Sequence, residues 1–272
     1  MTSPSPSQRI FDRLWHDYTL YNPEVKRIYD SFTETGEKVI NDHIAFRTFN
    51  DPRVNIDVLS RPFIRSGYVL KGTYTFEKKH LFARHFEDES SVDAPRVFIS
   101  ELILEEFSEF TQKTAKQVID QIPRDLLTSD ELIYSGNVWG KPSFEIYEKL
   151  RTESEYAAWV YVYGFCANHF TVSVNGLKNL NTLEKVNDFL KAKGFLLNTA
   201  EGEIKGTPQE LLEQSSTRAG IIEVEFSEGR FSIPSCYYEF ARRYPDRDGR
   251  LYSGFIAKSA DKIFESTDFY RK

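Results

Sequence analysis

The sequence predicts an α+β fold in which one arrangement of strands and helix occurs twice and encloses a single cleft. The order strand, helix, strand, strand, strand recurs over residues 41–104 and 167–240. In both parts the first strand carries a histidine near its start, and the helix ends at a glycine followed by an aromatic residue. The matching segments are Asn41-Asp42-His43 and Ala167-Asn168-His169 for the strands, and Gly67-Tyr68 and Gly194-Phe195 for the helices. Such an order predicts an internal repeat; two unrelated α+β segments are the alternative.

Composition limits the class of protein. The chain has 272 residues, 40% of them hydrophobic and 15% aromatic, which is enough to bury a core and excludes global disorder. The net charge of −6 and the lack of a long basic run do not favour nucleic-acid binding. Two cysteines are too few for a disulfide framework, and no apolar stretch is long enough for a membrane span. With no apolar signal core at the start, the expected location is cytoplasmic.

The predicted elements follow this repeat in order. Helices are expected over 9–40 and again over 105–160, where Pro123 and a loop from 134 to 142 interrupt them. The first module is expected to contain strands at 43–49, 68–76, 79–87 and 96–104 and a helix at 54–66. The second is expected to contain strands at 168–175, 195–200, 220–226 and 231–240 and a helix at 180–193. Residues 241–272 form a C-terminal segment, and the whole chain, 1–272, is expected to be one domain.

The first strand of each module has one apolar and one polar face, because strand side chains alternate with a period of two. His43, Ala45 and Arg47 share a face, and so do His169, Thr171 and Ser173. Two such faces opposed across a cleft would line a polar pocket.

A metal explains two histidines in such a pocket, because neutral imidazoles are common ligands of iron and zinc. One carboxylate would complete a facial triad and leave positions open for other ligands. Glu239, on the last strand of the second module, is the best candidate, and Glu101 stands on the corresponding strand of the first. We expect one glutamate to bind the metal and the other to lie nearby. The alternatives are core or surface histidines and a solvated edge carboxylate.

Other polar residues have simpler interpretations. Arg47 lies roughly 13 Å along the strand from His43 and could bind a carboxylate through two hydrogen bonds, or form a structural ion pair. Cys166 and Cys236 each precede a proposed ligand by three residues, so alternation places them on the opposite face, where they fit core packing. The chain has no nucleophile elbow, no P-loop and no dinucleotide fingerprint.

The resemblance to the 2-oxoadipate dioxygenase/decarboxylase family extends over about residues 10–267, and four segments carry it. They are Asn41-Asp-His-Ile-Ala-Phe-Arg-Thr-Phe49, Asn168-His169-Phe-Thr, Tyr237-Tyr-Glu239-Phe-Ala-Arg-Arg and Tyr252-Ser-Gly-Phe-Ile-Ala-Lys-Ser259. The resemblance implies a vicinal-oxygen-chelate-like core of two βαβββ modules that form a metal-binding cleft, with helices added at the N-terminus and between the modules.

The resemblance also implies a reaction and the residues that carry it. Fe(II) would be held by His43, His169 and Glu239, and Arg47 would bind a carboxylate of a 2-oxo diacid, with Ser259 near the substrate. The implied reaction converts 2-oxoadipate and O₂ to 2-hydroxyglutarate and CO₂. Lys258 stands where the family would place an apolar group, so the substrate can differ from 2-oxoadipate in length or polarity. Neither nucleic acid nor a membrane is an expected partner.

Two other classes of function remain open at this stage. One is a metal-dependent hydrolase, isomerase or lyase on the same scaffold, with zinc or manganese in place of iron. The other is a metabolite-binding protein without catalysis, which the complete His-His-Glu set argues against.

Overall fold

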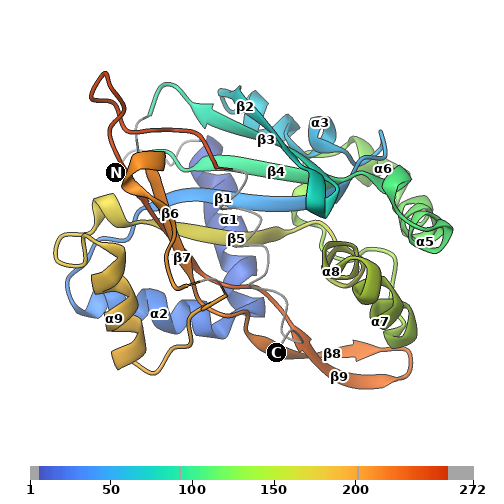
Figure 1. Ribbon diagram of the computed structural model, residues 1–272. Helices are drawn as coiled ribbons and strands as arrows, with labels where there is room; N and C mark the ends of the chain where they lie inside the picture. The colour runs from blue at the N-terminus through green and yellow to red at the C-terminus, as the bar shows by residue number, and fades with distance from the viewer. Residues whose placement is uncertain (1–5, 92, 201, 257–272) are drawn as a thin grey trace.

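The computed structural model describes residues 6–91, 93–200 and 202–256, and it contains one curled sheet of eight strands (Figure 1). The strand order is β2-β3-β4-β1-β5-β10-β7-β6. The first module consists of β1 (Asn41–Phe49), α3 (Ile56–Leu59), α4 (Arg61–Arg65), β2 (Tyr68–Phe76), β3 (Leu81–Asp88) and β4 (Arg96–Leu102). The second consists of β5 (Ala167–Ser173), α9 (Leu183–Ala192), β6 (Lys205–Thr207), β7 (Leu212–Ser216) and β10 (Glu239–Arg243).

The two modules have the same topology and meet through their first strands. In each, the fourth strand lies parallel to the first, as β4 does to β1 and β10 to β5. The strands β1 and β5 then pair antiparallel, with Ala45 opposite His169 and His43 opposite Thr171. This pairing makes the sheet continuous and brings both histidines to its centre, as the duplicated α+β fold predicted from the sequence requires.

Helices cover the convex face and close one end of the concave face. Besides α3, α4 and α9, the helices are α1 (Pro6–Tyr21), α2 (Pro23–Glu34), α5 (Glu109–Asp120), α6 (Arg124–Thr128), α7 (Phe144–Glu153) and α8 (Glu155–Tyr163). Short 3₁₀ helices join the elements: η1 (Glu77–Lys79), η2 (Leu104–Glu106), η3 (Asp130–Tyr134), η4 (Val174–Gly176) and η5 (Pro208–Glu210). No helix in the described ranges is long and apolar enough to cross a membrane.

Local sequence explains where several helices begin and end. Side chains of Asn55, Ser108, Ser143, Ser154 and Thr182 accept a backbone N–H at the start of α3, α5, α7, α8 and α9. The helices that precede β2 and follow β5 both end at a glycine with positive φ, 100° at Gly67 and 85° at Gly194. These are the two glycines that the sequence pattern marked as helix ends.

The apolar faces of the first strands pack under helices α1 and α4. Trp15 of α1 meets Phe170 of β5 edge to face, with ring centroids 5.0 Å apart. Phe46 of β1 packs against Phe63 of α4 at 5.5 Å. Since these residues occupy the convex side, the alternate residues, including His43 and His169, face the concave side.

The strand predictions for the second module are partly wrong. Residues 195–200 hold only an isolated bridge from Leu197 to Thr217, and the strands of the sheet lie later, at β6 and β7. The predicted strand 220–226 is β8 (Ile221–Phe226), which pairs with β9 (Gly229–Pro234) in a separate two-stranded hairpin. The predicted strand 231–240 is divided between β9 and β10, because residues 235–238 leave the sheet after Pro234.

Candidate metal centre

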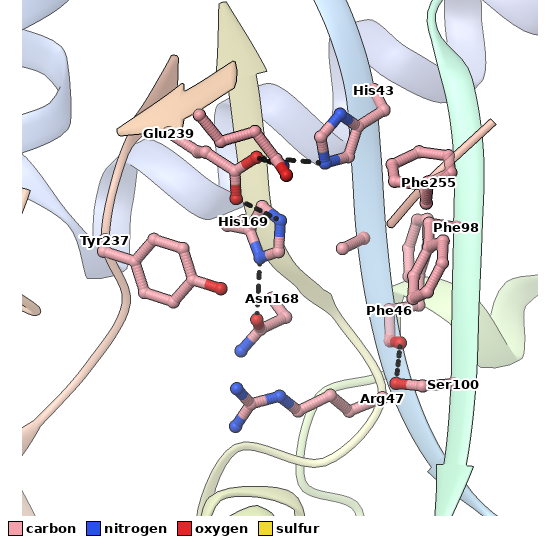
Figure 2. Close-up of a pocket in the computed structure, with 12 residues that line it drawn as sticks. His43, Phe46, Arg47, Phe98, Ser100, Asn168, His169, Tyr237, Glu239 and Phe255 are labelled. Atoms are coloured by element: carbon pink, nitrogen blue, oxygen red, sulfur yellow. Dashed lines mark hydrogen bonds and ion pairs between the residues drawn. The ribbon is translucent and has the colours of Figure 1, made fainter. Parts of the chain in front are cut away.

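His43, His169 and Glu239 meet at the junction of the two modules. One potential ligand atom from each lies within 4.8 Å of the others, and all three side chains are buried. The Nε2 atom of His43 is 3.5 Å from one oxygen of Glu239, and that of His169 is 3.3 Å from the other (Figure 2). The residues come from β1, β5 and β10, so the continuous sheet brings them together.

The residue before each histidine fixes its tautomer. Nδ1 of His43 donates to Oδ1 of Asp42 at 2.8 Å, and Nδ1 of His169 donates to Oδ1 of Asn168 at 2.9 Å. With the proton on Nδ1, each Nε2 carries a lone pair directed at the carboxylate of Glu239. Burial lowers the pKa of both histidines, most strongly for His169, so both imidazoles are neutral.

Glu239 is a buried carboxyl group whose ionised form is disfavoured by loss of water. Burial raises the pKa of Glu239 to about 8, although Gln214 donates a hydrogen bond to Oε1 at 2.5 Å. A divalent ion between Glu239 and the two Nε2 atoms would favour the ionised form. Two neutral imidazoles and one carboxylate therefore fit a divalent metal, and this donor set is typical of non-haem Fe(II) oxygenases.

Asp42 connects His43 to the C-terminal part of the described chain. Arg243 donates to both oxygens of Asp42, at 2.7 and 2.9 Å, and both side chains are buried. Arg243 also donates to the carbonyls of Tyr252 and Gly254. This anchors the segment that places the Phe255 ring against His43, with centroids 4.8 Å apart.

The three residues form the floor of a pocket with about 390 Å³ of space not occupied by atoms, part of it open to solvent. Its lining consists of His43, Ala45, Phe46, Arg47, Phe98, Ser100, Asn168, His169, Gln214, Tyr237, Glu239 and Phe255. The Arg47 side chain is buried, with its guanidinium 5.0 Å from the Tyr156 ring and 5.2 Å from the Trp159 ring, both in α8. The structure therefore places Arg47 in the same pocket as the histidines, as the strand alternation predicted.

The expectation that Glu101 lies beside the centre is wrong. Its carboxylate accepts the backbone N–H of Ile56 at 2.9 Å, at the start of α3. By register, Glu239 stands opposite Thr171, two residues after His169, and the residue opposite Ala45, two residues after His43, is Phe98. Phe98 therefore occupies the position in the first module that Glu239 occupies in the second.

Ser259, proposed to lie near the substrate, and Lys258 are outside the described residues. Cys166 and Cys236 are free thiols, and neither lines the pocket, in agreement with a packing role.

Sequence reasoning assigned no role to four polar neighbours of the centre, Asp42, Asn168, Thr171 and Gln214, although it placed Thr171 on the same strand face as His169. The hydroxyl of Thr171 lies 3.1 Å from Nε2 of His43. A signal for the first two was present, since each directly precedes a histidine at matching places in the repeat. Gln214 gave no signal because it lies on the unpredicted strand β7.

Comparison with known proteins assigns the family. A family model described as 2-oxoadipate dioxygenase/decarboxylase matches residues 16–135 and 131–251. The chain belongs to the 2-oxoadipate dioxygenase/decarboxylase family. The chloroplastic 2-oxoadipate dioxygenase/decarboxylase of Arabidopsis thaliana is 36% identical over 92% of this chain and 74% of its own length. The corresponding rice protein, named as chloroplastic/amyloplastic, is 34% identical over 92% of this chain and 75% of its own length.

Solved structures agree with this assignment. The rice hydroxyglutarate synthase in complex with 2-oxoadipate has a TM-score of 0.89 and 32% identity, over 98% of this chain and 95% of that one. A Shewanella frigidimarina protein described only as a candidate hydrolase has a TM-score of 0.88 and 48% identity, over 94% of this chain and 100% of that one. A glyoxalase superfamily protein from Ralstonia eutropha, with a TM-score of 0.73 and 22% identity over 92% and 85%, shares the fold. The vicinal-oxygen-chelate-like core implied by the sequence is thereby confirmed.

Proposed function

We propose that this chain is an Fe(II)-dependent dioxygenase and decarboxylase that converts 2-oxoadipate and O₂ to 2-hydroxyglutarate and CO₂. The observation that carries the proposal is the buried set of His43, His169 and Glu239, with both imidazoles held as neutral ligands. The names of the plant relatives and the 2-oxoadipate complex of the rice protein support the substrate.

Each part of the pocket has a role in this reaction. Fe(II) bound by His43, His169 and Glu239 would supply the Lewis acidity and the electrons for O₂ reduction. Asp42 and Asn168 hold the two imidazoles in the orientation that binding requires. Phe98 and Phe255, whose rings lie 4.8 Å apart, form an apolar wall that excludes water from the reacting end of the substrate.

Arg47 is proposed to bind the carboxylate that is distal to the keto group. It stands four residues along β1 from His43, so a diacid could reach from the metal centre toward the guanidinium. Its contacts with the rings of Tyr156 and Trp159 hold the guanidinium in position, which reduces the entropy lost on binding.

Oxygen uptake tests this function directly. Protein loaded with Fe(II) without oxygen is mixed with 2-oxoadipate and O₂, and products are identified by mass spectrometry. We expect O₂ consumption with equal amounts of CO₂ and 2-hydroxyglutarate, and His169→Ala as a matched control should lose both iron and activity. Absence of uptake with 2-oxoadipate and a panel of other 2-oxo acids would contradict an oxygenase and favour non-oxidative metal chemistry.

Two finer points belong to the same proposal. Iron is favoured over zinc, manganese or nickel because the reaction consumes O₂, and metal analysis of active protein tests this choice. A cytoplasmic location stays a prediction, to be tested by cell fractionation. The two plant relatives, by contrast, are named as plastid proteins.

A further inference from the structure

Tyr237 places a hydroxyl group in the pocket. This hydroxyl has no role in the metal site or in the carboxylate binding proposed for Arg47. The residue lies in the short segment between β9 and β10, and its side chain is fully buried. Its ring stacks on the imidazole of His169, with centroids 4.7 Å apart and planes inclined by 27°. The phenol oxygen points into the pocket (Figure 2).

The backbone around Tyr237 holds the ring in this place. The carbonyl of Tyr237 accepts a hydrogen bond from the Tyr18 hydroxyl of α1. On either side, the N–H of Cys236 donates to Asn22 at 3.0 Å, and the N–H of Tyr238 donates to Thr217 at 3.0 Å. Because the main chain is fixed on both sides, the phenol has little freedom to turn away from the pocket.

The polar groups near Tyr237 include two donors that lack an acceptor. Within the described part of the chain, the hydroxyl of Tyr237 and the Nδ2 of Asn168 are buried, and neither has an acceptor for its hydrogen. Both line the same pocket, and Arg47 is close enough to interact electrostatically with the phenol. Buried donors without partners are costly, so a group of them around a pocket indicates an acceptor-rich ligand.

We infer that Tyr237 donates a hydrogen bond to the substrate carboxylate that Arg47 binds, and so helps to select diacids over monoacids. This inference rests on the proposed function. A carboxylate has about four lone-pair sites, so it can accept from the phenol, the Asn168 amide and the guanidinium together. A methyl group in its place would leave these donors unsatisfied, which favours the diacid.

Tyr238 provides a matched control within the same sequence. Its hydroxyl is also buried and makes no hydrogen bond in the described part of the chain, but it does not line the pocket. Instead its ring packs against Trp15 and Phe240 in the core, with centroids 5.9 and 5.4 Å apart. Tyr238→Phe therefore removes an equivalent buried hydroxyl without touching the substrate.

The experiment compares Tyr237→Phe, Tyr238→Phe and the unaltered protein with two substrates of equal chain length, 2-oxoadipate and the monoacid 2-oxohexanoate. In Tyr237→Phe, KM for 2-oxoadipate should rise about tenfold or more, with kcat within about threefold, because a hydrogen bond to a charged group is lost in ground and transition states alike. KM for 2-oxohexanoate and the bound iron content should not change. Tyr238→Phe should leave all of these values as they were.

Each other outcome contradicts the inference. An unchanged KM for 2-oxoadipate in Tyr237→Phe would overturn it, as would an equal rise in KM for both substrates. Loss of folding in Tyr237→Phe would show that the hydroxyl has a structural partner, and would overturn it as well. If the unaltered protein neither binds nor converts 2-oxoadipate, the proposed function fails first, so the two failures are distinguishable.

Discussion

Asp42 is expected to stabilise both the fold and the metal centre, and replacing it separates the two effects. Its carboxylate and the Arg243 guanidinium are each about 2% exposed as side chains, and two hydrogen bonds of 2.7 and 2.9 Å join them. Removing one partner of a buried pair costs about 3–5 kcal/mol, because the other charge stays buried. Asp42→Ala should lower the free energy of unfolding by about this amount, measured by urea denaturation.

The same substitution removes the hydrogen bond that orients His43. Loss of such a partner weakens metal binding by about 10–100-fold. Asp42→Asn should keep the metal affinity within a few fold, because Asn168 orients His169 through an amide oxygen in the same way. It should still lose stability, since the amide cannot neutralise Arg243.

A surface pair supplies the control for stability. Asp30 pairs with Lys26 one helical turn away, and both are about half exposed, so Asp30→Ala should cost no more than about 1 kcal/mol. If Asp42→Ala unfolded at the same urea concentration as Asp30→Ala, or bound metal as tightly as the unaltered chain, the assignment of Asp42 would be refuted.

Three further outcomes are expected. Burial raises the pKa of Glu37, but hydrogen bonds from the backbone N–H groups of residues 178–180 lower this pKa by more. The ionised carboxylate therefore stabilises the folded state above the unfolded pKa of about 4.3, and this stabilisation is lost as pH falls through the folded pKa. Glu37→Gln should therefore cost about 1–2 kcal/mol at pH 7 and less below pH 4 in urea unfolding, and a pH-independent loss would contradict this. Removing the metal with a chelator should lower the melting temperature, because metal at 100 times its Kd adds about 2.7 kcal/mol to the free energy of unfolding. An equal fall in the melting temperature of His169→Ala would argue against the site. Phe98→Glu should tighten metal binding in a titration, and it should slow O₂ uptake because the new carboxylate would occupy an open coordination position. An unchanged metal affinity would refute the equivalence of positions 98 and 239.

The sequence was informative wherever local periodicity determines the structure. The faces of the first strands followed from alternation alone, which placed His43, Arg47 and His169 on the concave side. The helix ends at Gly67 and Gly194 followed from the need for positive φ. These features depend on residues close together in the chain, so one sequence is enough to predict them.

Features that depend on strand pairing were not predictable in this way. Strand β7 contains Gln214, Ser215 and Ser216, which are buried although polar, so it lacks the apolar pattern of a strand. The register of β4 on β1 is not visible in the sequence, so the sequence predicts Glu101 as the counterpart of Glu239, whereas Phe98 holds that position. Glu101 and Phe98 are three positions apart, an odd number, so the error moved the side chain to the other face of the sheet.

The difference between the two modules gives the pocket its chemistry. Both first strands supply a histidine, but only the second module adds a carboxylate. In the first module, Phe98 occupies the position that corresponds to Glu239. One wall of the pocket is thus apolar, made by Phe98 and Phe255, and the other is polar. We expect a 2-oxo diacid to lay its methylene chain along the first wall and its oxygens along the second. An exact repeat would have given two equal walls and four protein ligands, with fewer positions left for substrate and O₂. Loss of symmetry at one residue therefore leaves the centre open for its ligands.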